Sequence, residues 1–169
     1  MMVFFDVEAS VDRGTIRSRP ATPMTRLASV PGNLSSLVLS ADRSVRRRLE
    51  AATELAGWSI CDAPVDEIDF DSDSVASHDY QLVIVDLIHP LGGDLTAAQR
   101  AAERFSDRPE TLLVVCGEED SIDHEVWARC HGAFCHLSGS VSGDALVSLF
   151  NKARATANRH TSRTVRCGV

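Results

Sequence analysis

The chain has no long apolar run, no excess of basic residues and no regular set of cysteines. Its 169 residues carry a formal net charge of −7, which argues against a general nucleic-acid binder, because such proteins normally present a basic surface. No apolar stretch approaches the roughly 18 residues that a membrane-spanning helix needs. The five cysteines are odd in number and irregularly spaced, so we expect no disulfide framework. The opening MMVFF is too short for a signal-peptide core. These absences predict a reduced, cytoplasmic protein.

The composition is that of a folded domain with a tail at each end. Hydrophobic residues make up 44% of the chain and charged residues 24%, which is enough to bury a core. Residues 1–33 lack periodicity and contain three prolines, so we expect an irregular leader, and Met24 is a second possible start. Residues 34–157 are expected to form the domain, and residues 158–169 a basic, flexible tail.

Short apolar runs alternate with helical patterns along the predicted domain. Strands are expected at residues 37–39, 58–61, 81–85, 111–115 and 133–137. A helical period follows Asp42 and stops at Gly57, and a weaker, acidic helix is expected within 65–77. Thr96 and Gln99 fit a capping box at the start of the next helix. Two more helices are expected at 121–131 and from Leu146 to Ala157.

This alternation predicts an α/β fold. Five nearly all-apolar strands, each followed by a helix, form a parallel sheet that is covered by helices on both faces. We expect the flavodoxin-like arrangement with strand order 2-1-3-4-5. In such a sheet, ligands bind at the carboxyl ends of the strands, where Asp86 follows the apolar run VIV.

Three stretches together resemble the receiver domain of two-component response regulators. They are SADRSVRRRLEAATELAGW, YQLVIVDLIHP with its Asp-x-x-x-Pro spacing, and CHGAFCHLSG before the last helix. The similarity covers roughly residues 35–157. It implies a protein of bacterial signal transduction in which an aspartate accepts a phosphoryl group beside Mg²⁺. A hydroxyl residue and a lysine then contact the phosphoryl oxygens.

The resemblance assigns these roles to positions where most of the receiver residues are missing. Asp86 matches the phosphoacceptor, but the acidic pair falls on Ser40 and Ala41, and only the next residue, Asp42, is acidic. The remaining positions of the receiver set fall on Cys116 for the hydroxyl residue, Ser138 for the lysine and Cys135 for the aromatic switch. The resemblance is therefore to a degenerate receiver.

The missing residues weaken phosphoryl transfer for physical reasons. Mg²⁺ prefers carboxylate and other oxygen ligands, and Ala41 offers none. A lost lysine removes a charge-assisted hydrogen bond worth roughly 1.5–3 kcal/mol. The single lysine of the chain, Lys152, lies too far along the last helix to replace it, although an arginine remains an alternative. Asp42 is expected to cap the following helix rather than to bind metal.

Two other kinds of site compete with this interpretation. A thiol at Cys116 is redox-active only if a helix N-terminus or a cation lowers its pKa, and a buried, inert thiol is the simpler prediction. Cys130, His131, Cys135 and His136 contain zinc-ligand types, but neighbouring residues in a strand point to opposite faces, so we expect no metal site.

The sequence thus predicts a stand-alone, receiver-like interaction module that is independent of phosphorylation and is not an enzyme. No cofactor is expected, and Mg²⁺ would bind only if Asp86 still accepts phosphate, which is the first alternative. A small-molecule or redox protein that uses Cys116 is the second. The resemblance implies a protein partner, such as a histidine kinase, or a second copy, bound through the fourth helix, fifth strand and last helix. Trp127 and Cys135 are the candidate contact residues there.

Overall fold

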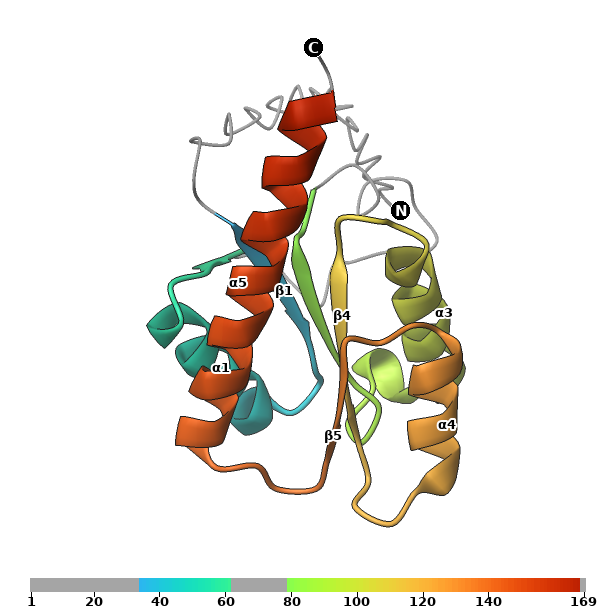
Figure 1. Cartoon of the computed structure of the whole chain (residues 1–169). Coiled ribbons are helices and arrows are strands. Elements are labelled where there is room, and N and C mark those ends of the chain that lie inside the picture. Colours follow the sequence, from blue (N-terminus) through green and yellow to red (C-terminus); the bar gives the residue numbers. More distant parts are fainter. Residues whose placement is uncertain (1–33, 62–78, 168–169) are drawn as a thin grey trace, which may run out of the picture.

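The computed structural model describes residues 34–61 and 79–167 (Figure 1). The leader expected at residues 1–33 and the acidic helix expected within 65–77 lie outside these described residues. None of the helices in the described part is both long enough and apolar enough to cross a membrane.

A five-stranded parallel sheet forms the centre of the domain, in the order β2-β1-β3-β4-β5. This confirms the predicted fold class and strand order. All five predicted strands are present, with boundaries that differ by a few residues: β1 (Ser35–Leu39), β2 (Ser59–Ile60), β3 (Leu82–Asp86), β4 (Leu112–Gly117) and β5 (Cys135–Ser138).

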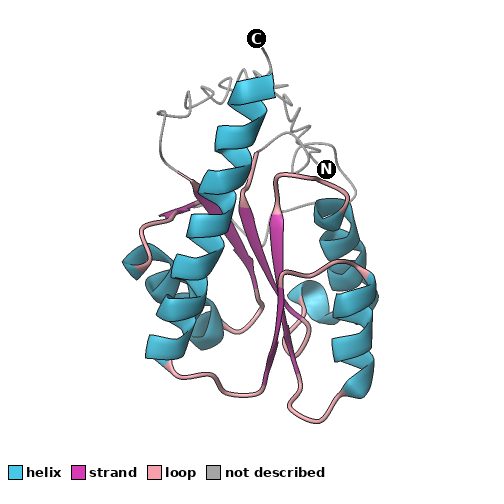
Figure 2. Ribbon diagram, viewed as in Figure 1, coloured by secondary structure: helices cyan, strands magenta, loops and turns pink. Residues whose placement is uncertain are grey.

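Helices cover both faces of the sheet (Figures 1 and 2). On one face lie α1 (Arg43–Leu55) and α5 (Gly143–Cys167), which pack against each other. On the other face lie α3 (Leu95–Ser106), which follows a 3₁₀ turn at Leu91–Gly93, and α4 (Ile122–Cys130). Because both faces are covered, the central strand β3 is buried along its whole length and reads as a continuous apolar run.

Each face of the sheet has its own hydrophobic core, because successive strand residues point to opposite sides. On the α1 and α5 side, Val38, Ile84 and Phe150 pack together. On the α3 and α4 side, Val83, Phe105 and other apolar residues do the same. These two cores fix the strand ends in register, which positions the residues of the candidate site.

The ends of the helices follow local side-chain chemistry. Asp42 caps α1, as predicted, by accepting hydrogen bonds from the backbone N–H groups of Ser44 and Val45. Gly57 adopts a positive φ of 80° directly after the helix, which confirms it as the stop. The capping box predicted at Thr96 is wrong, because Asp94 caps α3 by accepting from the backbone N–H of Thr96.

The last helix is longer than the sequence pattern indicated. Its apolar stripe ends at Ala157, and we expected a flexible tail from there, but α5 continues to Cys167. No proline or glycine occurs between residue 158 and Cys167. Once the packed turns have nucleated a helix, each further residue costs little to add. The absence of a stop signal therefore outweighs the loss of the apolar stripe.

Candidate functional site

The carboxyl ends of β1, β3 and β4 bring three of the predicted site residues together. Leu39 pairs with Val85 and Asp86 pairs with Cys116 in the sheet register, so Ser40, Asp86 and Cys116 are neighbours at one edge. This is the edge at which parallel α/β sheets bind ligands. Three of the predicted receiver positions therefore lie together in the fold.

Asp86 lies at the centre of this edge and uses both carboxylate oxygens within the chain. Oδ1 accepts hydrogen bonds from the backbone N–H groups of Ile88, at 2.9 Å, and His89, at 3.2 Å. Oδ2 accepts from the hydroxyl of Ser40, at 2.7 Å, and lies 3.1 Å from Nδ1 of His89. The side chain is only 1% exposed. The carboxylate thus joins the end of β1 to the loop after β3.

This hydrogen bonding engages both carboxylate oxygens of Asp86 with donors of its own chain. A phosphoacceptor must present one oxygen, with an accessible lone pair, to a phosphoryl donor that is held in line. Ser40 and His89 both occupy the surroundings of Oδ2, and the two loop amides hold Oδ1. A phosphoryl donor would therefore have to approach Asp86 past these contacts.

The positions of the missing acidic pair do not form a magnesium site. Ser40 is fully buried and donates its hydroxyl to Asp86, and the exposed Ala41 has no ligand atom. Asp42 is committed to the N-terminus of α1, where the N–H of Val45, and next that of Ser44, lower the pKa of its carboxyl group. Mg²⁺ requires a near-octahedral set of oxygen ligands. The oxygens present here do not fit that ion.

A cavity of about 210 Å³ lies beside Asp86, and Arg48 of α1 and Cys116 line it as well. Burial raises the pKa of the Cys116 thiol to about 12, with a further rise from the charge of Asp86 and a smaller opposing effect of Arg48. The thiol therefore stays protonated at neutral pH and is a poor nucleophile. The redox alternative gains no support from this environment.

We expect Cys116 to react slowly with thiol reagents between pH 7 and 9. A thiol with a pKa of about 12 supplies almost no thiolate in this range, whereas Cys130 is exposed at the end of α4. Iodoacetamide labelling followed by peptide mass spectrometry would measure both rates in one sample. Cys130 should be labelled at least about tenfold faster, since one pKa unit is a tenfold change in thiolate. Labelling in urea is the control, because both thiols should then react at similar rates. Equal labelling rates of Cys116 and Cys130 in the folded protein would contradict the predicted protection of Cys116.

The remaining predicted residues do not line the cavity at Asp86. Ser138 is exposed at the end of β5 and lines a different cavity, between β5 and α4. Cys135 packs against the core of the α1 and α5 side and is only partly exposed. Trp127 is also partly buried, packs against the opposite core and stacks on His131 at 4.5 Å. Its packing favours a core role for Trp127 over the predicted interface anchor.

Sequence analysis missed His89 and Arg48. His89 contributes both its backbone N–H and its ring nitrogen to Asp86, and Arg48 brings a cation to the cavity beside it. For His89, the sequence signal was its position three residues after Asp86 and directly before Pro90. For Arg48 there was no comparable signal, because it is one of several arginines in α1.

Among the described residues, no group of three or more histidine, cysteine or acidic side chains is arranged to hold a metal ion. The four residues considered for zinc are separated in the structure. His131 stacks on Trp127 and lies 3.2 Å from Oε1 of Glu103. Cys135 packs against the core of the α1 and α5 side, whereas the ring of His136 lies against Gly117.

Solved structures of response regulators share this arrangement of strands and helices. A CheY-like receiver domain protein from Methanospirillum hungatei aligns with a TM-score of 0.58 at 14% identity, over 76% of this chain and 98% of that one. A response regulator from Thermotoga maritima aligns with a TM-score of 0.57 at 18% identity, over 73% and 98%. The fold is that of a receiver domain. At these identities the similarity establishes the receiver fold and not the chemistry of the site.

A third similar structure carries the modification that is in question here. A response regulator from Burkholderia pseudomallei, solved with a phosphorylated aspartic acid, a calcium ion and citrate, aligns with a TM-score of 0.54 at 17% identity, over 78% of this chain and 75% of that one. No protein-family model matches the sequence. No curated protein matches it either.

Proposed function

We propose that this chain is a degenerate receiver, which acts as a protein-interaction module in bacterial signal transduction without a phosphorylation switch. One observation carries the proposal. The carboxylate of Asp86 is buried and accepts hydrogen bonds from Ser40, Ile88 and His89 of its own chain. In this proposal Asp86 holds the loop after β3 in one fixed conformation. The surface beside this loop can then bind a partner without prior phosphorylation.

The residues around Asp86 support this proposal as well. Phosphoryl transfer depends on positioning and on neutralising the charge that develops on the phosphoryl oxygens. Ser40 and Ala41 replace the acidic pair that would hold Mg²⁺, and Ser138 in place of the lysine carries no charge. A module that only binds partners needs none of these groups. We therefore also propose that the chain has no enzymatic activity of its own and works in the cytoplasm.

The proposal is tested by adding Mg²⁺ with beryllofluoride, which mimics a phosphoryl group on a carboxylate. The readout is the pair of amide signals of Ile88 and His89 in a ¹H–¹⁵N correlation spectrum, because both N–H groups bond to Asp86. We expect both signals to stay in place at saturating reagent. A shift of both signals that is absent in Asp86→Asn would show that the site still binds a phosphoryl mimic and would overturn the proposal.

A receiver that is still phosphorylated on Asp86 is the second candidate, and Arg48 is the observation that favours it. The exposed Arg48 lines the same cavity as Asp86 and acts electrostatically on Cys116. Its guanidinium therefore brings positive charge to the site, which lacks the lysine of a receiver. Arginine binds phosphate through a planar pair of N–H donors. If this candidate holds, Arg48→Ala should abolish the beryllofluoride response, whereas Arg47→Ala on the exposed side of α1 should not.

A further inference from the structure

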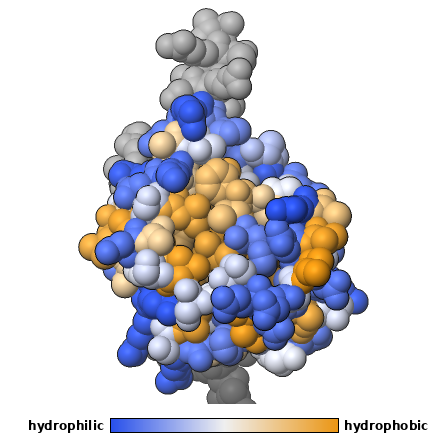
Figure 3. Space-filling view, turned by 60° about the horizontal axis from the view of Figure 1, so that its bottom comes forward, coloured by the Kyte–Doolittle hydropathy of each residue, from blue (hydrophilic) through white to orange (hydrophobic). Residues whose placement is uncertain are grey.

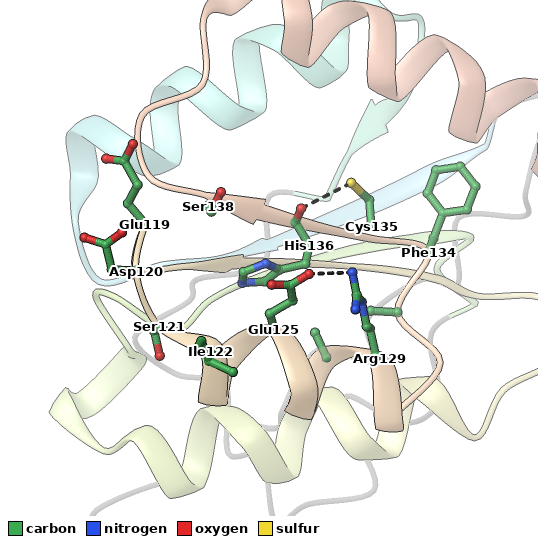
Figure 4. A pocket seen from close by; sticks show the side chains of 12 residues that line it. Glu119, Asp120, Ser121, Ile122, Glu125, Arg129, Phe134, Cys135, His136 and Ser138 are labelled. Carbon is green, nitrogen blue, oxygen red and sulfur yellow. Dashed lines mark hydrogen bonds and ion pairs between the residues drawn. The ribbon is translucent and has the colours of Figure 1, made fainter.

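A groove with a volume of about 550 Å³ lies between α4 and β5, apart from the cavity at Asp86 (Figure 4). It is lined by the loop before α4, by residues of α4 and by residues of β5. Glu119 and Asp120 stand at one end, Phe134 at the other, and His136 lies between them. The groove lies on the fourth-helix and fifth-strand surface where a partner was expected from the resemblance, but nothing above says which kind of partner fits it.

Exposed apolar side chains border the groove. Ile122 and Phe134 line the groove and are 73% and 37% exposed, and Phe134 directly precedes β5. Val126, one helical turn after Ile122, does not line the groove but is 51% exposed on α4. Single exposed apolar residues are ordinary, but two at one groove, with a third on the same helix, are typical of a binding surface. Figure 3 shows hydrophobic residues on the side of the molecule where α4 lies, next to hydrophilic ones.

The same end of the molecule is strongly acidic. The sequence from Glu118 to Glu125 contains five carboxylates, and those of Glu118, Glu119, Asp120 and Asp123 are exposed. Glu125 is paired with Arg129, but no ion pair is formed by Glu119 or Asp120 within the part of the chain that the structure describes. The groove therefore has an apolar wall and an uncompensated negative rim.

The floor of the groove contributes no negative charge of its own. The ring of His136 lies so close to Gly117 that a Cβ there would collide with Nε2, and this nitrogen is buried without a hydrogen-bond partner among the described residues. Burial lowers the pKa of His136, the neighbouring His124 and Arg129 act in the same direction, and Glu125 opposes them. At neutral pH the ring is uncharged, so the charge of the groove is set by its rim.

We propose that this groove binds an amphipathic, basic helix of a partner protein, which inserts aliphatic side chains between Ile122 and Phe134 and places lysine or arginine side chains against Glu119 and Asp120. Helices bind grooves through apolar anchors at i, i+3, i+4 and i+7. The inference rests on the proposed role as an interaction module and specifies the chemistry of its partner.

Charge selects this occupant over the alternatives. Nucleic acids and anionic membrane surfaces are both negative, and an acidic rim repels them. A symmetric second copy would bring the same patch against itself, so that two acidic rims would lie in one interface. A positively charged segment is the partner whose charge complements this rim and whose apolar face can cover Ile122.

The test uses the full chain and a fluorescein-labelled peptide of leucine and lysine, with leucines at i, i+3, i+4 and i+7. Fluorescence anisotropy measures the dissociation constant. A peptide with glutamate in place of every lysine is the charge control. We expect the lysine peptide to bind and the glutamate peptide not to bind, and the affinity should fall as salt is added, because salt screens the contacts with the rim.

Two pairs of variants separate the apolar wall from the rim. Ile122→Ser should weaken binding by about tenfold or more, as removal of a central apolar anchor does. Leu55→Ser, at the 77% exposed Leu55 on α1, is its matched control and should change nothing. Glu119→Gln with Asp120→Asn should weaken binding about fivefold and flatten the salt dependence. Glu54→Gln, at an exposed acid of α1, is the control for charge.

Several outcomes would overturn the inference. They are no binding of the lysine peptide, equal binding of the glutamate peptide, or an equal loss of binding in Leu55→Ser and Ile122→Ser. Sedimentation that shows a wild-type dimer and an Ile122→Ser monomer would assign the groove to a second copy instead. Repeating the titration after treatment with acetyl phosphate and Mg²⁺ separates the two proposals. Binding of the lysine peptide only after treatment would support the basic partner but overturn the proposal that the module is independent of phosphorylation. No binding in either state would overturn the proposed binding site and leave the proposed function untouched.

Discussion

Replacing Asp86 by alanine is expected to lower the free energy of unfolding by about 2–4 kcal/mol, because buried donors lose their shared acceptor. The hydroxyl of Ser40 and the backbone N–H groups of Ile88 and His89 all bond to this carboxylate. Each buried donor left without a partner costs about 1–3 kcal/mol, and water that enters the space compensates part of the sum. Equilibrium urea unfolding, followed by circular dichroism, measures the change.

Two further variants are controls for the stability change of Asp86→Ala. Asp86→Asn keeps one carbonyl oxygen for the loop amides and should lose less stability than Asp86→Ala. Asp120→Ala removes an exposed carboxylate at the same edge of the sheet and should change stability by less than about 0.5 kcal/mol. A carboxylate that is kept for chemistry often strains its site, so its removal stabilises the fold. An Asp86→Ala variant as stable as wild type, or more stable, would contradict the structural role.

Replacing Phe150 by alanine is expected to cost about 3–5 kcal/mol of stability, because it leaves a large cavity in the core. Phe150 is fully buried where α5 packs on the sheet, and it belongs to the same cluster as Ile84 and Leu146. Its backbone carbonyl also accepts a hydrogen bond of 3.1 Å from Nε1 of the buried Trp58. The loss is measured by urea unfolding, with tryptophan fluorescence as the second probe.

Leu149→Ala is the matched control for this prediction. Leu149 is the preceding residue of α5 and packs only partly against the same core, so its truncation should cost clearly less than that of Phe150. Both substitutions leave the helix propensity high, because alanine is the best helix former. Equal losses at the two positions would mean that α5 does not pack on the sheet through Phe150, which the described arrangement requires.

The fold could be predicted from the sequence because its signals are local and repeated. The buried strand β3 reads as the apolar run LVIV, and the helical period from Val45 to Ala56 follows directly after a capping aspartate. Burial of both sheet faces makes such runs unambiguous. The cap at Asp42 and the stop at Gly57 were predicted for the same reason, since each depends on one side chain and its adjacent backbone.

The detailed site could be predicted only in part, because it depends on where loops place their side chains. The predicted strand order places Ser40, Asp86 and Cys116 at one edge of the sheet. It does not predict that the ring of His89 contacts the carboxylate of Asp86. Nor did it show that Ser138 belongs to the groove beside α4. The exposed Ile122 and Val126 were missed because α4 has apolar residues on more than one side, and only packing shows that Trp127 faces inward.

We propose above that Asp86 is a structural carboxylate and not a phosphoacceptor. The most direct test is the intact mass of the protein after incubation with acetyl phosphate and Mg²⁺, measured beside Asp86→Asn, with circular dichroism to show that both are folded. We predict that the wild-type mass stays unchanged. A phosphate adduct on the wild-type protein that is absent from Asp86→Asn would show that the site still accepts a phosphoryl group and would contradict the claim.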